Sequence, residues 1–511
     1  MGFHNALDKY FQISARGSTL AVEIRAGLAT FLTIAYIMAV NPQILSAGGL
    51  EQSEVFTATC LSSIIASAGL GLFANLPFAI SPGMGMNAYL AFNQVLGAHA
   101  TPEQALATVL VAAVIVAFLA IVRALSVIMH LVPNTVKLAT VLGMGLLLSL
   151  IGMHECGIVV PDPQTMVGMG NLLTPEAIVA GVGLALITVL LSKNVKGSIL
   201  IGIAAAAIAL WTVRGDWPTA FFAVPKLRIY TPDFSKILAG NGGALSAILA
   251  YTLVMVFDIG GALFGLGSLA GLQEGGKVAG SVAAYLSAAA GSVIGAILGT
   301  TPLIISAESA VGIKEGGRTG LVGLVVAACF VISLPIAPLL QALPAEATAP
   351  VLVLVGAMMM SEAANLDWTD MKVAVPAFLT MAVQPFTFSI SNGIYVGLAF
   401  SVMLWILTGD FLDTFRLWGE SLKRASQQTG GGTGAAEGAM ADGLETLLDT
   451  TEQATGHHAH VHVPESLLPN FVRYSEVMGS PPMRGGMLSH VASRDRSARG
   501  GTAGLNQEPS L

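Results

Sequence analysis

The amino-acid sequence predicts an all-α polytopic membrane protein with about fourteen transmembrane segments. Three observations lead to this fold class. The 511 residues are 54% hydrophobic and only 10% charged, whereas an average soluble domain is roughly 25% charged. Apolar stretches follow one another almost without pause between residues 24 and 408. Most of the Lys and Arg residues lie in alternate connections between these stretches.

The composition also excludes several classes of protein. A soluble enzyme of this length would need more charge to cover its surface, and the mean hydropathy is +0.75. The net charge of −7 argues against a nucleic-acid partner, which would require a basic groove. Three widely spaced cysteines, Cys60, Cys156 and Cys329, form neither a disulfide framework nor a metal motif. We therefore expect a lipid bilayer around the chain, with no cofactor and no nucleic acid.

The apolar stretches have lengths suited to crossing a bilayer, which takes about 20 helical residues. Before them, residues 1–23 form an N-terminal segment that we expect to be cytoplasmic and interfacial, because Phe3, Leu7 and Tyr10 have helical spacing. After them, residues 409–511 form a Gly-rich cytoplasmic tail that we expect to be largely disordered. The transmembrane domain covers residues 24–408, with predicted spans at 24–42, 54–75, 77–97, 102–122, 133–153, 174–192, 196–213, 244–270, 278–299, 300–313, 318–343, 348–361, 369–389 and 391–408.

The basic residues orient these spans, because cytoplasmic loops of membrane proteins are enriched in Lys and Arg. With the N-terminus inside, only one longer outer loop carries basic residues, namely Arg214, Lys226, Arg228 and Lys236. The cytoplasmic side receives Lys9, Arg16, Arg25, Arg123, Lys137, Lys193, Lys196, Lys277, Lys314, Arg318, Lys372, Arg416, Lys423 and Arg424. This bias supports an even number of spans and places both termini in the cytoplasm.

The two halves of the transmembrane domain look related. Pro82 in span 3 and Pro302 in span 10 each interrupt an apolar segment, and Pro133 and Pro350 each stand near the fifth span of their half. Seven spans per half is an odd number, so the second copy must be inverted in the membrane. Inverted repeats with paired broken segments are typical of secondary transporters, and the breaks point to the binding site.

Two acidic residues, Asp258 and Glu308, lie inside predicted spans. A charged group at that depth costs ~2.5–3.5 kcal/mol on insertion scales, so it suggests a functional site. No Lys or Arg lies mid-span to neutralise them. Two carboxylates without a cation suit a cationic ligand, or a neutral ligand rich in N–H donors. Either carboxyl group is also a candidate proton carrier.

Five further residues complete the candidate substrate site. Gly260 follows Asp258 closely and would permit a helix break beside it or a close approach of the backbone to a ligand, with close helix packing as the competing explanation for the glycines of this segment. Gly85 and Ala307 lie at the broken spans, where backbone N–H groups could bind a ligand. Asn87 offers an amide, and Tyr89 a ring that either stacks on the ligand or simply packs. With Asp258 and Glu308, these residues form the predicted substrate site, and the two acids are the predicted proton-coupling groups.

Several stretches of the chain resemble the AzgA-like purine transporters of the nucleobase–ascorbate transporter superfamily, with the plant and algal members most similar. The resemblance covers roughly residues 1–410. The matching stretches are GLATFLTIAYIMAVNPQIL (27–45), ISPGMGMNAYLAFNQV (80–95), VPNTVKLATVLGMGLLLSLIGM (132–153), ESAVGIKEGGRTGL (308–321) and VPAFLTMAVQPFTFSISNGI (375–394).

This resemblance implies a 7+7 inverted repeat with two domains. A core domain would hold spans 1–4 and 8–11, and a gate domain would hold spans 5–7 and 12–14. The acids of this family's spans 8 and 10 fall on Asp258 and Glu308, with the substrate between spans 3, 8 and 10. The resemblance implies uptake of adenine, guanine and hypoxanthine across the plasma membrane, driven by protons. It leaves a homodimer open.

The sequence thus predicts a secondary active transporter for purine nucleobases that works by alternating access, and not an enzyme. An alternative is a transporter of the same architecture for uracil, xanthine, a cytokinin-like purine or an inorganic anion. A channel would leave the paired broken spans unexplained. An intramembrane enzyme could use two carboxylates as acid and base, but no His, Ser or Cys constellation accompanies them.

Overall fold

The computed structural model describes residues 3–410, apart from 99, 126–127, 130–131 and 275–276. The predicted tail over 409–511 lies outside these described residues, except for Gly409 and Asp410. The helices and strands are α1 (Phe3–Phe11), α2 (Leu20–Ile34), α3 (Ile37–Ala47), α4 (Gln52–Gly69), η1 (Leu70–Ala74), β1 (Ile80–Pro82), α5 (Met84–Ala88), η2 (Tyr89–Gly97), α6 (Pro102–Ile121), α8 (Asn134–Glu155), β2 (Val159–Asp162), β3 (Met166–Met169), α9 (Pro175–Ser192), α10 (Ser198–Arg214), α11 (Ser235–Leu238), α12 (Gly242–Leu269), β4 (Gln273–Glu274), β5 (Lys277–Val278), α13 (Ser281–Leu298), β6 (Leu303–Ile305), α14 (Ser309–Lys314), α15 (Leu321–Ser333), η3 (Leu334–Ile336), α16 (Ala337–Gln341), α17 (Ala345–Met359), η4 (Met360–Asn365), α18 (Met371–Thr387) and α19 (Ile390–Leu407).

The helices match the predicted membrane segments. Within the described residues, ten helices are long and apolar enough to cross a bilayer. The other predicted spans correspond to α10 and α18, with 17 residues each, and to the two segments built from β1–α5–η2 and β6–α14. The prediction of an all-α membrane protein with broken spans 3 and 10 is therefore confirmed.

Polar side chains cap several of the membrane helices where they begin. Thr101 and Gln104 form a reciprocal capping box at the start of α6. Asn241 accepts hydrogen bonds from the N–H groups of Gly243 and Ala244 at the start of α12. Because the first N–H groups of a helix have no partner within the helix, such caps favour a start at these positions.

The two broken spans cross each other through their extended pieces. β1 pairs antiparallel with β6, so that Ile80 lies opposite Ile305 and Pro82 opposite Leu303. Hydroxyl groups hold each strand in an equivalent way. The Oγ of Ser67 in α4 accepts from Ile80 N at 2.9 Å, and the Oγ of Ser292 in α13 accepts from Leu303 N at 2.8 Å. This correspondence supports the predicted internal repeat.

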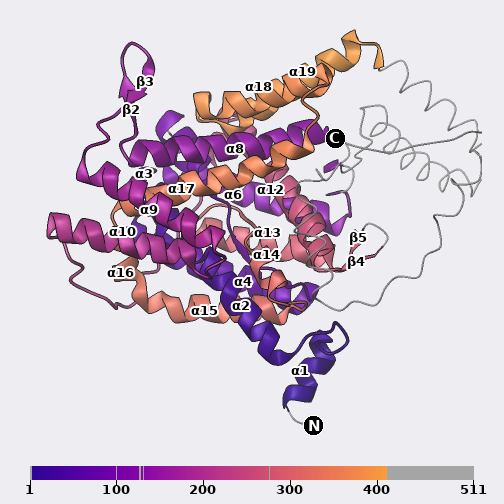
Figure 1. The fold of residues 1–511 in the computed structure, drawn as a ribbon. Coiled ribbons are helices and arrows are strands. Elements are labelled where there is room, and N and C mark those ends of the chain that lie inside the picture. The colour runs from indigo at the N-terminus through magenta and orange to yellow at the C-terminus, as the bar shows by residue number, and fades with distance from the viewer. Residues whose placement is uncertain (1–2, 99, 126–127, 130–131, 275–276, 411–511) are drawn as a thin grey trace, which may run out of the picture. The chain divides into compact units, whose positions relative to one another are not determined.

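The membrane helices pack in two groups. In one group, α13 packs against α4 and α6, while α15 packs against α2 and α4. In the other, α8 packs against α17 and α18, and α9 against α10 and α17. Figure 1 shows α8, α17 and α18 above α2, α4 and α15. Contacts of α12 with α19, α5 with α8 and α3 with α17 join the groups.

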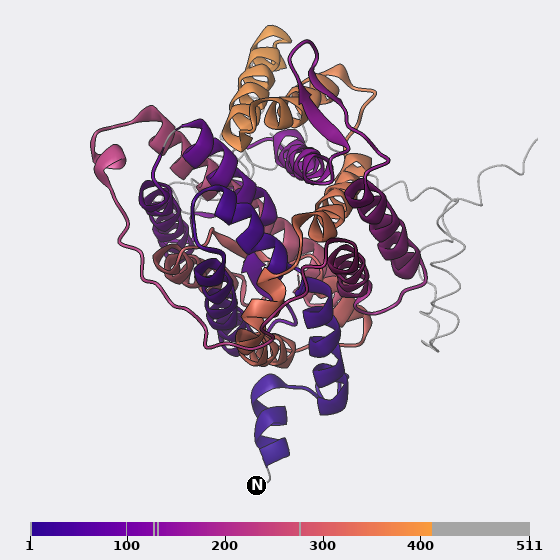
Figure 2. The same cartoon turned by 90° about the vertical axis from the view of Figure 1, so that its left-hand side faces the viewer.

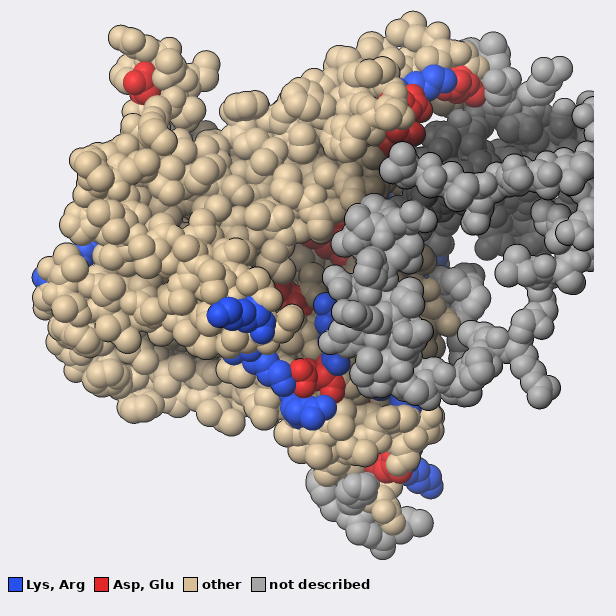
Figure 3. All heavy atoms as spheres, in the orientation of Figure 1, with Lys and Arg blue, Asp and Glu red and all other residues tan. Residues whose placement is uncertain are grey.

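The ends of the bundle carry different features. Figures 1 and 2 show α1 projecting from one end and the β2–β3 hairpin from the other. Figure 3 shows a face that is mostly uncharged, with its charged groups in a few patches. After the end of α14, Glu315 Oε2 lies 2.9 Å from Lys196 Nζ and 3.2 Å from Arg25 Nε. These ion pairs lie in loops and at helix ends, as the predicted topology requires.

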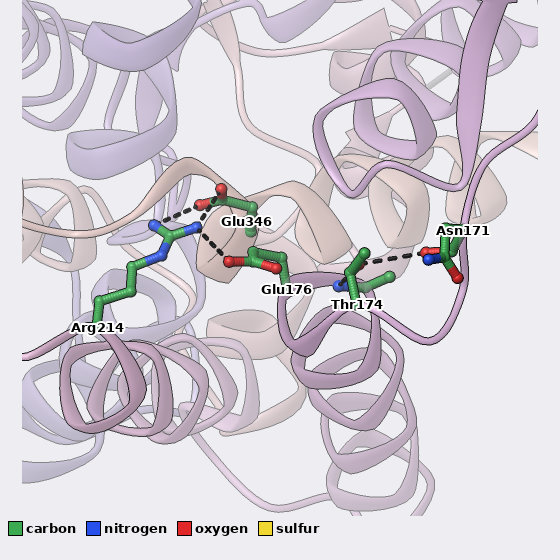
Figure 4. A network of polar contacts seen from close by, with 6 residues as sticks. Asn171, Thr174, Glu176, Arg214 and Glu346 are labelled. Atoms are coloured by element: carbon green, nitrogen blue, oxygen red, sulfur yellow. Dashed lines mark hydrogen bonds and ion pairs between the residues drawn. The ribbon is translucent and has the colours of Figure 1, made fainter.

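An ion-pair network joins three helix ends. Arg214, the last residue of α10, places Nη2 2.6 Å from Glu346 Oε1 and 3.3 Å from Glu176 Oε1. Figure 4 shows its guanidinium between the two carboxylates, with Thr174 capping α9 nearby. Because the two acids begin α17 and α9, Arg214 ties three helices of one packing group together.

Two details of the spans differ from the sequence-based expectation. The helix does not break beside Asp258, since α12 continues through Gly260 to Leu269. A Cβ atom on Gly260 would lie only 2.8 Å from the hydroxyl of Tyr285, so this glycine permits close helix packing instead. Span 1 is less regular than expected, because Ala35 and Tyr36 form a turn between α2 and α3, although the backbone of both residues stays in the helical region.

Candidate functional site

Glu308 lies at the tip of the second broken span. It follows β6 closely and is the N-cap residue of α14. Its side chain is half-buried, and its Oε1 accepts a hydrogen bond from the hydroxyl of Tyr36 at 2.8 Å. The preceding residue, Ala307, is exposed although its neighbours Ser306 and Ser309 are buried. The carboxylate therefore stands beside an accessible backbone segment in the middle of the broken span.

Asp258 lies in the second half of the long helix α12 and is also half-buried. Within the described part of the chain, no residue makes a hydrogen bond or an ion pair with its carboxyl group. The same helix packs against β6 and α14. The structure thus brings the helix that carries Asp258 alongside the segment that carries Glu308, and it leaves both oxygens of Asp258 available to a ligand.

The three predicted residues of the first broken span are more enclosed than expected. A Cβ atom on Gly85 would lie 2.7 Å from Met144 Sδ of α8, so a neighbouring helix covers this glycine. Asn87 is fully buried, and its Oδ1 accepts from the hydroxyl of Thr301. Tyr89 is 1% exposed, and its hydroxyl lies 3.1 Å from the Oγ of Ser391. These residues therefore connect neighbouring segments of the protein, and their side chains are buried in those contacts.

Hydroxyl groups that the sequence analysis did not single out hold the crossing of the two broken spans. Each residue just before the proline of a break carries one, namely Ser81 before Pro82 and Thr301 before Pro302. Ser81 Oγ lies 2.7 Å from Ser306 Oγ, and Thr301 donates to Asn87. A hydroxyl residue precedes the proline of the break in both halves, and this recurrence is the sequence signal that would have identified Ser81 and Thr301.

Gly260, which the sequence predicted in the site, lies outside it, whereas Tyr36, which the sequence did not single out, contacts a site residue. Gly260 packs against Tyr285 of α13 and Met129, which places it in a helix interface. Tyr36 contacts Glu308 directly, but it lies within an apolar stretch that gives no polar pattern. Of the predicted residues, the structure thus brings Ala307 and Glu308 together with the helix of Asp258, while Gly85, Asn87, Tyr89 and Gly260 make packing or supporting contacts.

A comparison with protein-family models decides the class of the protein. The model described as "Permease family" matches residues 22–396. The chain belongs to this permease family. It is therefore an integral multi-pass membrane transporter and not an enzyme, and the resemblance to purine permeases indicated by the sequence motifs is confirmed.

Curated relatives match over most of their length. The chain is 37% identical over 398 residues to the guanine/hypoxanthine permease PbuO of Bacillus subtilis, covering 76% of this chain and 92% of the relative. It is 33% identical over 410 residues to the adenine permease AdeP of Escherichia coli, covering 80% of this chain and 92% of the relative.

Solved structures share the fold at low sequence identity. The transmembrane domain of the cyanobacterial bicarbonate transporter BicA aligns with a TM-score of 0.55 and 17% identity, covering 75% of this chain and 97% of that domain. The structure of SLC26A9 aligns with a TM-score of 0.55 and 13% identity, covering 76% of this chain and 66% of that one. At such identities the likeness describes the architecture alone.

Proposed function

We propose that this permease is a proton-coupled importer of purine nucleobases, with adenine, guanine and hypoxanthine as substrates. The observation that carries the proposal is the pair of half-buried carboxyl groups, Asp258 and Glu308, on membrane segments that pack together. The names of the similar permeases from Bacillus subtilis and Escherichia coli support the substrate class. The plasma membrane is the expected location, with both termini in the cytoplasm.

The carboxylates would recognise the donor edges of the base. Adenine and guanine present ring N–H groups and an exocyclic amine, while hypoxanthine presents ring N–H groups only, and a carboxylate accepts hydrogen bonds from such donors. Asp258 has both oxygens available, and Glu308 retains Oε2 after its bond with Tyr36. The accessible backbone at Ala307 lies next to Glu308 and would complete the contact with the base. Asn87 would support this backbone through Thr301.

Proton coupling would use Asp258. A carboxyl group that has no partner among the described residues changes protonation without breaking a hydrogen bond or an ion pair there, whereas Glu308 is tied to Tyr36. Transport would then proceed by movement of a core domain, spans 1–4 and 8–11, against a gate domain, spans 5–7 and 12–14. The two packing groups of the helices support this division.

Uptake of labelled hypoxanthine by cells that lack their own purine permeases tests the proposal. Expression of the chain should confer saturable uptake that adenine and guanine inhibit. Asp258→Asn and Glu308→Gln should each abolish uptake, while Glu362→Gln, at an acid in the short η4 helix, should leave it unchanged. Inhibition by uracil, xanthine or bicarbonate, with no effect of adenine or guanine, would instead favour a transporter of the same architecture for another substrate.

A further inference from the structure

Tyr36 lies where the regular hydrogen bonding of the first membrane segment is interrupted. α2 ends at Ile34 and α3 begins at Ile37, so Tyr36 belongs to the turn between them. At this turn, Met38 N donates to Ala35 O at 3.1 Å, three residues back instead of four. This local tightening of the helix sets the direction in which the Tyr36 side chain leaves the backbone.

The ring of Tyr36 is held by packing. It is 3% exposed and belongs to the same apolar cluster as Met84 and Ala88 of α5 and Leu147 of α8. The ring thus belongs to an apolar cluster that includes residues of the first broken span, while its hydroxyl reaches the tip of the second. A buried phenol hydroxyl needs a partner, and here the partner is the carboxylate of Glu308 at 2.8 Å.

This contact makes the two oxygens of Glu308 unequal. A hydrogen bond to a carboxylate is stronger than one between neutral groups and fixes the side-chain torsions of the acid. Because Tyr36 occupies Oε1, Oε2 is the oxygen that remains for a ligand. The neighbouring α14 backbone is already engaged, since Val311 N donates to the carbonyl oxygen of Glu308 at 3.0 Å. Tyr36 thereby determines where the free oxygen points.

We propose that Tyr36 is a positioning residue for substrate recognition, which holds Glu308 so that Oε2 accepts one N–H of the purine. The inference rests on the proposed function, because it concerns the same binding site. Tyr36 itself need not touch the base. Its loss should therefore weaken binding of those substrates that donate to Glu308, and it should leave the movement of the protein largely intact.

Tyr36→Phe removes the hydroxyl and keeps the ring. We expect KM for hypoxanthine uptake to rise about tenfold, as expected for partial loss of a hydrogen bond to a charged group, with the maximal rate within about twofold of wild type. Tyr230→Phe is a matched control, because the Tyr230 hydroxyl donates to Glu54 Oε2 at 2.7 Å in the outer region, away from the site. Its KM should equal that of wild type.

Methylated analogues separate positioning from a general structural effect. Binding of hypoxanthine and its 1-, 7- and 9-methyl derivatives is measured on purified protein by the ligand-induced shift in melting temperature. An analogue whose binding is insensitive to Glu308→Gln should be equally insensitive to Tyr36→Phe. Equal weakening of every analogue by Tyr36→Phe would overturn the proposal, as would an unchanged KM. If wild-type protein binds no purine, the proposed function itself fails.

Discussion

Tyr89 of η2 and Ser391 of α19 bring their hydroxyl oxygens to within 3.1 Å, across the boundary between the two packing groups of helices. The Tyr89 ring also meets the edge of Tyr251, with ring centroids 5.4 Å apart. Tyr251 lies in α12 about two turns before Asp258, or ~10 Å along the axis. These buried side chains form a layer of contacts that the predicted topology places on the outer side of the candidate site.

A cysteine placed in this layer should be protected from the outside. In a background without the native cysteines, Ser391→Cys should react slowly with an impermeant maleimide, because Ser391 is 2% exposed. Adding Tyr89→Phe should raise that rate several-fold by removing the hydroxyl at the contact. Met166→Cys, at an 86% exposed position of the β2–β3 hairpin, which the predicted topology places outside, is the fast-reacting control. Equal maleimide reaction rates with and without the Tyr89 hydroxyl would show that this hydroxyl does not protect position 391.

The native thiol of Cys156, which directly follows α8, should itself react slowly with a maleimide. Burial, together with the carboxylates of Glu155 and Glu346, raises the pKa of the Cys156 thiol to about 12. Because the thiolate is the reactive form, Cys156 should be slow at neutral pH and should react faster only as pH rises toward that pKa. A fast reaction of the wild-type protein at pH 7 would contradict this assignment.

Replacing Arg214 by Lys should loosen the outer helix ends. The planar guanidinium contacts Glu346 through two nitrogens and also reaches Glu176, whereas an ammonium group cannot reproduce that fork. Because the network is partly exposed, the loss should be modest, a fall of a few degrees in melting temperature measured in detergent. High salt should shrink the difference between variant and wild type. A variant as stable as wild type at low salt would show that the network adds no stability.

Gln384 should be replaceable with a gain in stability. Both atoms of its amide group are buried without a hydrogen-bond partner among the described residues. An unpaired buried polar group costs roughly 1–3 kcal/mol, so Gln384→Met, of similar shape, should raise the melting temperature. Gln94→Met should lower it, because Gln94 bonds to Tyr251 at 2.7 Å and to Thr108 at 3.0 Å. A lower melting temperature in both variants would indicate that the Gln384 amide has a polar partner in the folded protein.

Gly320 marks a place where two backbones touch. A Cβ atom there would lie 2.0 Å from the carbonyl oxygen of Gly71, which cannot move aside as a flexible side chain could. Gly320→Ala should therefore destabilise the protein by about 1–3 kcal/mol or more, seen as a lower melting temperature and aggregation in size-exclusion chromatography. Gly181→Ala is the matched control, because a Cβ atom on Gly181 would meet nothing within 4 Å. Similar behaviour of the two variants would contradict the close contact.

The sequence predicted those features that a few local signals determine. Hydropathy located the spans, because a bilayer crossing needs a long apolar helix. Pro82 and Pro302 located the extended pieces, since proline removes an N–H donor from the helix. Asp258 and Glu308 stood out because a chain with so little charge rarely places a carboxylate mid-span.

The remaining features depend on contacts between distant segments. Tyr36 lies in an apolar stretch, and only the fold brings its hydroxyl to Glu308. The partners of Asn87 and Tyr89 are Thr301 and Ser391, which a local pattern does not identify. The break that Gly260 would have permitted does not occur, for a related reason. A glycine in a membrane helix permits either a break or close packing, and here Tyr285 lies where a side chain would be.

Transport by purified protein in proteoliposomes tests the central claim, that purine uptake is coupled to protons through Asp258. Hypoxanthine uptake by the wild type should increase when the outside is made acidic. Asp258→Asn should lose this response to the imposed pH gradient while the protein remains folded, as judged by its melting temperature. A variant that responds to the gradient as strongly as the wild type would contradict the account.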